Sequence, residues 1–131
     1  PVEFVSLDEV LRSSDYVSVH IPLTQDNKGL FDRVQFAKMK KGSYFINTAR
    51  GSLVDEQSLV DALKSRQLAG AAVDVLSKEP MDNKCFLIGQ QRLLITPHMA
   101  WATLEARERL IDASVENIKA FQNGKPINLV H

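Results

Sequence analysis

Four short apolar segments recur along the chain, separated by stretches with helical periodicity. The segments are Tyr16–Ile21, Ser43–Ile46, Ala71–Leu76 and Leu93–Ile95. Their hydrophobic residues are nearly continuous rather than alternating, which is typical of strands buried on both faces of a parallel sheet. Because helical patterns fill most of the gaps between them, the sequence predicts an α/β fold in which helices cover a parallel sheet.

Polar capping residues mark where several of the predicted helices begin. Ser6 and Glu9 have the spacing of a capping box, and Asp55 and Thr103 each stand directly before a helical pattern. Helices are predicted from Ser6 through Leu11, over Val34–Met39 and Glu56–Ser65, and at about 103–123, with a short strand at Ile127–Val130. Gly124 is the predicted stop of the last helix.

Composition and charge narrow the function classes. The chain has 131 residues, enough for one domain, and sixteen basic residues balance sixteen acidic ones. Without a net positive charge, neither nucleic acid nor a membrane surface is the expected partner. The single Cys85 cannot form an internal disulfide, which favours a cytoplasmic location. Because the chain opens without Met, we expect a piece of a larger protein, with a processed product as the alternative.

The segment NTARGSLVDE, Asn47–Glu56, joins a buried strand to a helix. In a parallel sheet this corner binds ligands, because strand carboxyl ends and helix amino ends converge there. Arg50 stands at the corner beside Gly51, and a guanidinium suits a planar carboxylate that it can grip with two hydrogen bonds. The structural alternative is an arginine that bridges a nearby aspartate.

Hydrogen-bonding or titratable residues stand near the carboxyl end of each of the four predicted strands. They are His20 and Pro22, then Asn47–Arg50, then Asp74 and Glu79, then His98. Since parallel strands end at one edge of the sheet, we expect these residues to converge there, with Arg50, Glu79 and His98 around one pocket. No metal site is expected among them.

Proton transfer is the chemistry that this edge favours. His98 can give or take a proton near neutral pH, and Glu79 is the candidate carboxylate that would favour its charged form. Structural alternatives are a hydrogen-bonded core histidine and a solvated glutamate. Asp74 interrupts an apolar strand, so it should be partly buried and need a partner or ligand.

The motifs together resemble a known family. In order they are VSVHIPLT, FINTARGSLVDEQSLVDAL, GAAVDVLSKEP and ITPHMAWAT. This series resembles the NAD-dependent D-isomer-specific 2-hydroxyacid dehydrogenases over nearly the whole chain. The ending PHMAWATLEARERL and the INLV tail look most like the glycerate dehydrogenases, also called hydroxypyruvate reductases.

The resemblance implies a reaction and roles for residues. The parent protein would reduce a 2-keto acid, hydroxypyruvate to D-glycerate, with NAD or NADP, as a cytoplasmic homodimer. Arg50 would hold the substrate carboxylate, His98 would protonate the carbonyl oxygen, and Glu79 would pair with His98. The implied cofactor-binding residues are His20, Pro22, Thr48, Ala49, Asp74 and Ala100.

One family feature is missing from the chain. No G-x-G-x-x-G turn for the cofactor pyrophosphate is present, so residues 1–131 resemble the later half of a Rossmann-type NAD-binding domain plus the terminal helix. Alone, this part should have little activity, an unpaired edge at Tyr16–Ile21 and one sheet face without helices, and it should associate or be marginally stable. The alternatives are a co-repressor-like NAD-sensing protein of the same fold and a proteolytic core of the enzyme.

Overall fold

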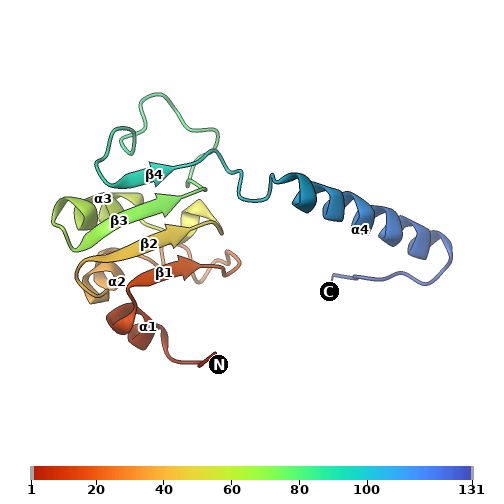
Figure 1. Cartoon of the computed structure of the whole chain (residues 1–131), viewed down its shortest axis with the longest axis horizontal. Helices are drawn as coiled ribbons and strands as arrows, with labels where there is room; N and C mark the ends of the chain where they lie inside the picture. Colours follow the sequence, from red (N-terminus) through yellow and green to blue (C-terminus); the bar gives the residue numbers. More distant parts are fainter. Residues whose placement is uncertain (1, 131) are drawn as a thin grey trace. The chain divides into compact units, whose positions relative to one another are not determined.

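The computed structural model describes residues 2–130 of the protein. The chain divides into two compact units, a first that ends at His98 and a second that begins at Met99. The first unit contains the sheet and the helices that pack on it, and the second contains one long helix (Figure 1).

The first unit is an α/β layer with four parallel strands in the order β1-β2-β3-β4. The strands are β1 (Tyr16–Val19), β2 (Ser43–Asn47), β3 (Leu68–Val73) and β4 (Leu93–Ile95). The helices of this unit are α1 (Leu7–Ser13), α2 (Arg33–Lys38) and α3 (Glu56–Lys64), and α2 and α3 lie behind the strands in Figure 1. Because all strands run the same way, their carboxyl ends meet at one edge.

Three of the predicted helix caps are confirmed. The side chains of Ser6, Asp55 and Thr103 accept hydrogen bonds from the main-chain N–H groups of Glu9, Gln57 and Ala106. Each cap satisfies a donor that has no partner inside its own helix. The sequence pattern placed the second helix one residue late, because Asp32 is its cap and α2 begins at Arg33.

The strand ends differ from their predicted positions. The segment predicted as Ala71–Leu76 is β3 at Leu68–Val73, and β1 stops at Val19, two residues before the predicted end. Strand ends depend on the neighbouring strand: Val73 is the last residue of β3 that pairs with β4, opposite Ile95. The prediction that Asp74 interrupts a strand is therefore wrong, since it directly follows one.

The core lies between one face of the sheet and the helices. Phe45 of β2 is fully buried, and its ring centroid lies 5.1 Å from those of both Phe31 and Phe36. Tilted and edge-on ring pairs of this kind are favourable. Replacing such a buried phenylalanine with alanine typically costs about 3–5 kcal/mol of stability.

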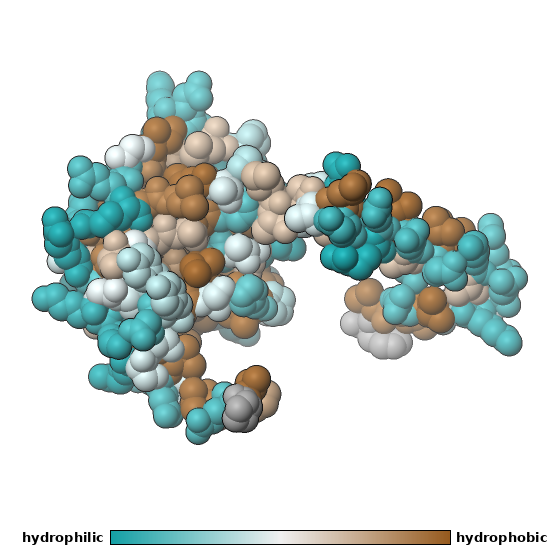
Figure 2. Space-filling view, in the orientation of Figure 1, coloured by the Kyte–Doolittle hydropathy of each residue, from teal (hydrophilic) through white to brown (hydrophobic). Residues whose placement is uncertain are grey.

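No helix of the first unit, within residues 2–98, covers the opposite face of the sheet. Burial alternates along β1, where Val17 and Val19 are buried while Tyr16 is 67% exposed, and Leu94 of β4 is 62% exposed. Figure 2 shows hydrophobic side chains, in brown, on the sheet face turned to the viewer. Within the first unit, the strands are therefore buried on one face rather than two, as is typical of a sheet with helices on one side only.

The second unit is dominated by α4 (Leu104–Gln122), within the predicted bounds. None of its residues is buried, and the apolar side chains of Leu110, Ile118 and Phe121 are exposed. The strand predicted at Ile127–Val130 is absent from the described chain, where Asn128 has a φ of +54°, a left-handed conformation that interrupts extended backbone. Within residues 2–130, no helix is both long and apolar enough to span a bilayer.

Candidate active site

Asn47, the last residue of β2, shapes the turn that follows the strand. Its side chain is fully buried; Nδ2 donates to the Arg50 carbonyl at 2.9 Å, and Oδ1 accepts from the Ala49 N–H at 3.0 Å. A buried amide without such partners would be costly, so these bonds fix the turn as well as the side chain. Sequence reasoning assigned Asn47 no role of its own, although a polar residue that closes a buried strand is the signal for one.

Arg50 projects from this turn at the carboxyl edge of the sheet. Its side chain is exposed, and Nη1 donates to the carbonyl of Ala49 at 2.7 Å. No carboxylate forms a salt bridge with it in the part of the chain that the structure describes. Arg50 lines a cavity of about 700 Å³ together with His20, Pro22, Thr48 and Ala49, residues that the sequence predicted at one site.

Gly51 brings this turn into contact with the segment that leaves β3. A Cβ atom at Gly51 would lie 1.9 Å from the carbonyl carbon of Leu76 and 2.4 Å from the amide nitrogen of Ser77. Only a residue without a side chain allows this approach. The loops after β2 and β3 are therefore packed backbone to backbone.

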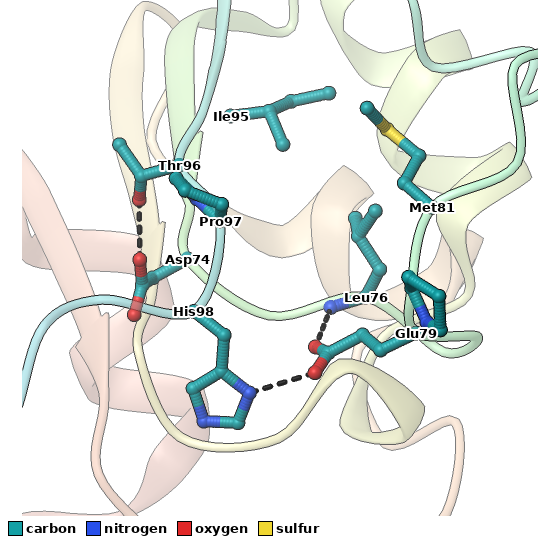
Figure 3. A pocket seen from close by; sticks show the side chains of 9 residues that line it. Asp74, Leu76, Glu79, Met81, Ile95, Thr96, Pro97 and His98 are labelled. Carbon is teal, nitrogen blue, oxygen red and sulfur yellow. Dashed lines mark hydrogen bonds and ion pairs between the residues drawn. The ribbon is translucent and has the colours of Figure 1, made fainter.

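Glu79 and His98 form an ion pair or hydrogen bond across the loops that follow β3 and β4. Glu79 Oε2 lies 2.7 Å from His98 Nδ1, and the other carboxylate oxygen, Oε1, accepts from the Leu76 N–H at 2.8 Å. The predicted pairing is thus present, and Figure 3 shows the imidazole directed at the carboxylate. The Leu76 N–H, followed by the bond from His98, lowers the pKa of Glu79 below its ordinary value, so the carboxylate stays charged at neutral pH.

The backbone that carries His98 is unusual. Its φ is +54°, in the left-handed region that non-glycine residues seldom adopt, and its N–H donates to the Thr96 carbonyl across Pro97. Such conformations are found at functional sites, where the surrounding structure maintains them. The side chain is 44% exposed, so it is accessible to a ligand.

Asp74 is buried and has a side-chain partner. It is 5% exposed, and the hydroxyl of Thr96 donates to its Oδ1 in a short hydrogen bond. The prediction that Asp74 needs a partner is therefore confirmed. Asp74, Glu79 and His98 line a cavity of about 660 Å³, with an apolar wall that includes Leu76, Met81 and Ile95 (Figure 3).

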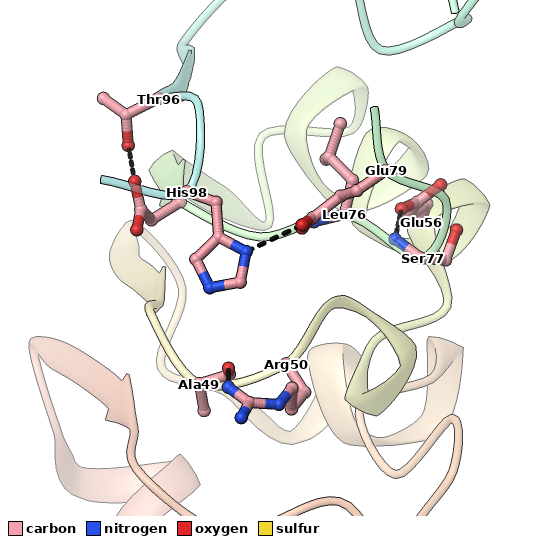
Figure 4. Close-up of polar contacts among 9 residues, drawn as sticks. Ala49, Arg50, Glu56, Leu76, Ser77, Glu79, Thr96 and His98 are labelled. Atoms are coloured by element: carbon pink, nitrogen blue, oxygen red, sulfur yellow. Dashed lines mark hydrogen bonds and ion pairs between the residues drawn. The ribbon is translucent and has the colours of Figure 1, made fainter. Parts of the chain in front are cut away.

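The expectation that Arg50, Glu79 and His98 surround a single pocket needs correction. Arg50 lines one cavity, and Glu79 and His98 line another; the Arg50 side chain bends back so that its Nη1 donates to the Ala49 carbonyl. Both cavities open at the carboxyl edge of the sheet, and in Figure 4 the His98 ring points toward the Ala49–Arg50 turn. Ala100 belongs to the second unit, and its contact with a cofactor stays a prediction.

Comparison with known proteins assigns the chain to a family. The family described as D-isomer specific 2-hydroxyacid dehydrogenase, NAD binding domain, matches residues 1–100. The chain belongs to this family. It therefore carries part of an NAD-binding domain, as the motifs indicated, and the family acts on 2-keto and 2-hydroxy acids.

Curated relatives in this family differ in their named substrates. The chain is 43% identical to a hydroxypyruvate reductase of Blautia hydrogenotrophica, over 98% of this chain and 40% of the relative. It is 44% identical to a glycerate dehydrogenase of Methylorubrum extorquens (96% and 41%) and 43% identical to a glyoxylate reductase of Thermofilum pendens (95% and 37%). The chain thus spans about two fifths of the length of these relatives.

Two solved structures similar to this chain were determined with a nicotinamide cofactor. An acyclic imino acid reductase in complex with NADPH and D-Arg matches with a TM-score of 0.87 at 34% identity, over 97% of this chain and 40% of the other. A D-lactate dehydrogenase with NAD+ from Lactobacillus jensenii matches with a TM-score of 0.85 at 29% identity, over 97% and 42%. The family's cofactor is therefore NAD or NADP.

Proposed function

We propose that the full-length protein reduces hydroxypyruvate to D-glycerate with NADH or NADPH. The observation that carries the proposal is the Glu79–His98 pair, held at the carboxyl edge of an NAD-binding sheet. The motifs at the end of the chain and its similarity to hydroxypyruvate reductase and glycerate dehydrogenase support the choice of keto acid. The chain contributes the later half of the NAD-binding domain, and the rest of the protein supplies the phosphate-binding turn.

The nicotinamide, when bound, supplies the hydride. As the new C–H bond forms at the carbonyl carbon, the electrons of the C=O π bond move to oxygen, which takes the proton of an imidazolium. Because Nδ1 of His98 is directed to Glu79, this proton comes from Nε2. Glu79 stabilises the imidazolium before transfer, and in the reverse reaction His98 takes the proton back.

Arg50 is proposed to bind the substrate carboxylate and to stabilise the charge that develops on the carbonyl oxygen. Its side chain is exposed at the same edge and forms no salt bridge within the described chain. A guanidinium can meet a planar carboxylate with two parallel bonds. In the structure Nη1 donates to the Ala49 carbonyl, and in the proposal the guanidinium exchanges this bond for the substrate carboxylate.

The residues around both cavities fit a nicotinamide cofactor. Asp74 offers a buried carboxylate that can accept from a carboxamide NH₂, beside an apolar wall. The remaining proposed cofactor contacts are His20, Pro22, Thr48, Ala49 and Ala100. We also propose that the full-length protein is a cytoplasmic homodimer, as the resemblance implies.

Steady-state assays of the full-length protein test this function. Hydroxypyruvate, glyoxylate and pyruvate are compared with NADH and with NADPH, and the size of the protein is measured by light scattering. We expect the highest kcat/KM with hydroxypyruvate. Binding of NADH without turnover of any keto acid would favour the NAD-sensing alternative and contradict the proposal.

A further inference from the structure

Two consecutive main-chain amides after β3 are bound by two different carboxylates. The N–H of Leu76 donates to Glu79 Oε1 at 2.8 Å, and the N–H of Ser77 donates to Glu56 Oε1 at 2.7 Å (Figure 4). Glu56 is partly buried and is the first residue of α3, 21 residues before Ser77 in the sequence. The first turn of α3 is thereby tied to the segment that carries Glu79.

Gly51 also contacts this segment, at the peptide group between Leu76 and Ser77. The carbonyl carbon and oxygen of Leu76 lie so near Gly51 that no Cβ could fit between them. Gly51 packs against the peptide between Leu76 and Ser77, and Glu56 binds its N–H. This peptide is therefore fixed by contacts from both Gly51 and Glu56, and its position determines where the Leu76 N–H can meet Glu79.

We propose that Glu56 is a positioning residue for the Glu79–His98 pair. Glu56 holds the Ser77 N–H and thereby fixes the segment that also carries the Leu76 N–H. The Leu76 N–H orients the Glu79 carboxylate, and this carboxylate orients His98. This inference rests on the proposed function, because it assigns Glu56 an effect on proton transfer. Glu56 contacts neither substrate nor cofactor in this account and acts only through Glu79.

A purely structural role for Glu56 makes a different prediction. A negative charge in the first turn of a helix stabilises the helix through its dipole, whichever acidic residue carries it. Positioning instead requires an acceptor oxygen at the full length of the side chain. E56D keeps the charge but shortens the side chain, whereas E56Q keeps the length and the acceptor but loses the charge.

The variants E56D and E56Q are made in the full-length protein, with D61A as a control in the exposed part of the same helix. We expect E56D to lose about 10- to 100-fold in kcat, because small misplacement of a catalytic group has effects of this size. E56Q and D61A should stay near the wild type. In E56D, the pH above which keto acid reduction falls should move down, in the same direction as in E79Q.

A double-mutant cycle tests whether Glu56 acts through Glu79. If it does, adding E56D to E79Q causes no further shift in the pH profile, because the carboxylate that Glu56 positions is already gone. Full additivity would overturn the proposal. Loss of activity in a folded E56Q variant would also overturn it, and this result does not depend on whether E56D folds.

Amide hydrogen exchange gives a readout that does not depend on turnover. In E56D, the amides of both Ser77 and Leu76 should exchange faster. Loss of the bond between the Ser77 N–H and residue 56 should also loosen the bond between the Leu76 N–H and Glu79. Unchanged exchange at Leu76 would overturn the inference even if Ser77 is released. Absence of keto acid turnover in the wild type would instead refute the proposed function, so the two failures are distinguishable.

Discussion

Glu79 Oε2 lies 2.7 Å from Nδ1 of His98, although 19 residues separate the two in the sequence. The loops after β3 and β4 bring them together, and the Leu76 N–H fixes the second carboxylate oxygen. The carboxylate is therefore oriented before any ligand binds. Such preorganisation suits a group that stabilises a positive charge on its neighbour.

Replacing Glu79 with glutamine should change the pH dependence of keto acid reduction. The reduction needs a charged imidazolium at His98, and the variant removes the negative charge that stabilises it. The pH above which kcat/KM falls should therefore move to lower values in E79Q. The measurement is a pH–rate profile of the full-length protein with NADH, and a profile that overlays the wild type would refute the pairing's role.

Glu79 should also contribute to stability in a pH-dependent way. The Leu76 N–H and His98 lower the carboxyl pKa in the folded state, so the contribution is present above the ordinary pKa of glutamate. This stability contribution is lost as the pH falls through the lowered pKa that the carboxyl group has in the folded state. We expect the difference in Tm between wild type and E79Q to shrink on acidification, and a difference that grows in acid would contradict this sign.

Asn47→Ala should destabilise the protein and weaken substrate binding together. The change leaves the Ala49 N–H and the Arg50 carbonyl without their side-chain partner, at a cost of about 1–3 kcal/mol. Denaturant unfolding measures the first effect and KM for hydroxypyruvate the second. Asn83→Ala, in an exposed loop, is the matched control and should change neither.

Arg50→Ala should impair both binding and turnover of the keto acid. The proposed guanidinium contact meets the carboxylate in the ground state and the developing oxyanion in the transition state, so KM should rise while kcat falls. Arg33→Ala, an exposed arginine at the start of α2, serves as the control. An unchanged kcat/KM in the Arg50 variant would remove it from the mechanism.

Local patterns predicted the elements of the fold better than their ends. The caps at Ser6, Asp55 and Thr103 were recognisable because the side chain and the amide that it binds are two or three residues apart. The end of β3 was not recognisable in the sequence, because it depends on pairing with the neighbouring strand β4. A run of apolar residues carries no information about which of them have a neighbouring strand.

Part of the candidate site followed from the sequence for a similar reason. Parallel strands place Glu79 and His98 at one edge, so the pair was predictable from the order of the motifs. The contributions of Gly51 and Glu56 were not, because they depend on the close packing of α3 and its preceding turn against Leu76 and Ser77. The sequence could not specify the orientation of Arg50 either, since a flexible side chain has several acceptors within reach.

The most direct test of the central claim is the kcat of His98→Ala in the full-length protein. If His98 donates the proton to the carbonyl oxygen, kcat for reduction of hydroxypyruvate should fall by roughly 10²–10⁴, the usual contribution of one positioned acid or base. NADH binding, followed by fluorescence titration, should persist and show that the variant is folded. A variant that binds NADH and turns over at the wild-type rate would contradict the account.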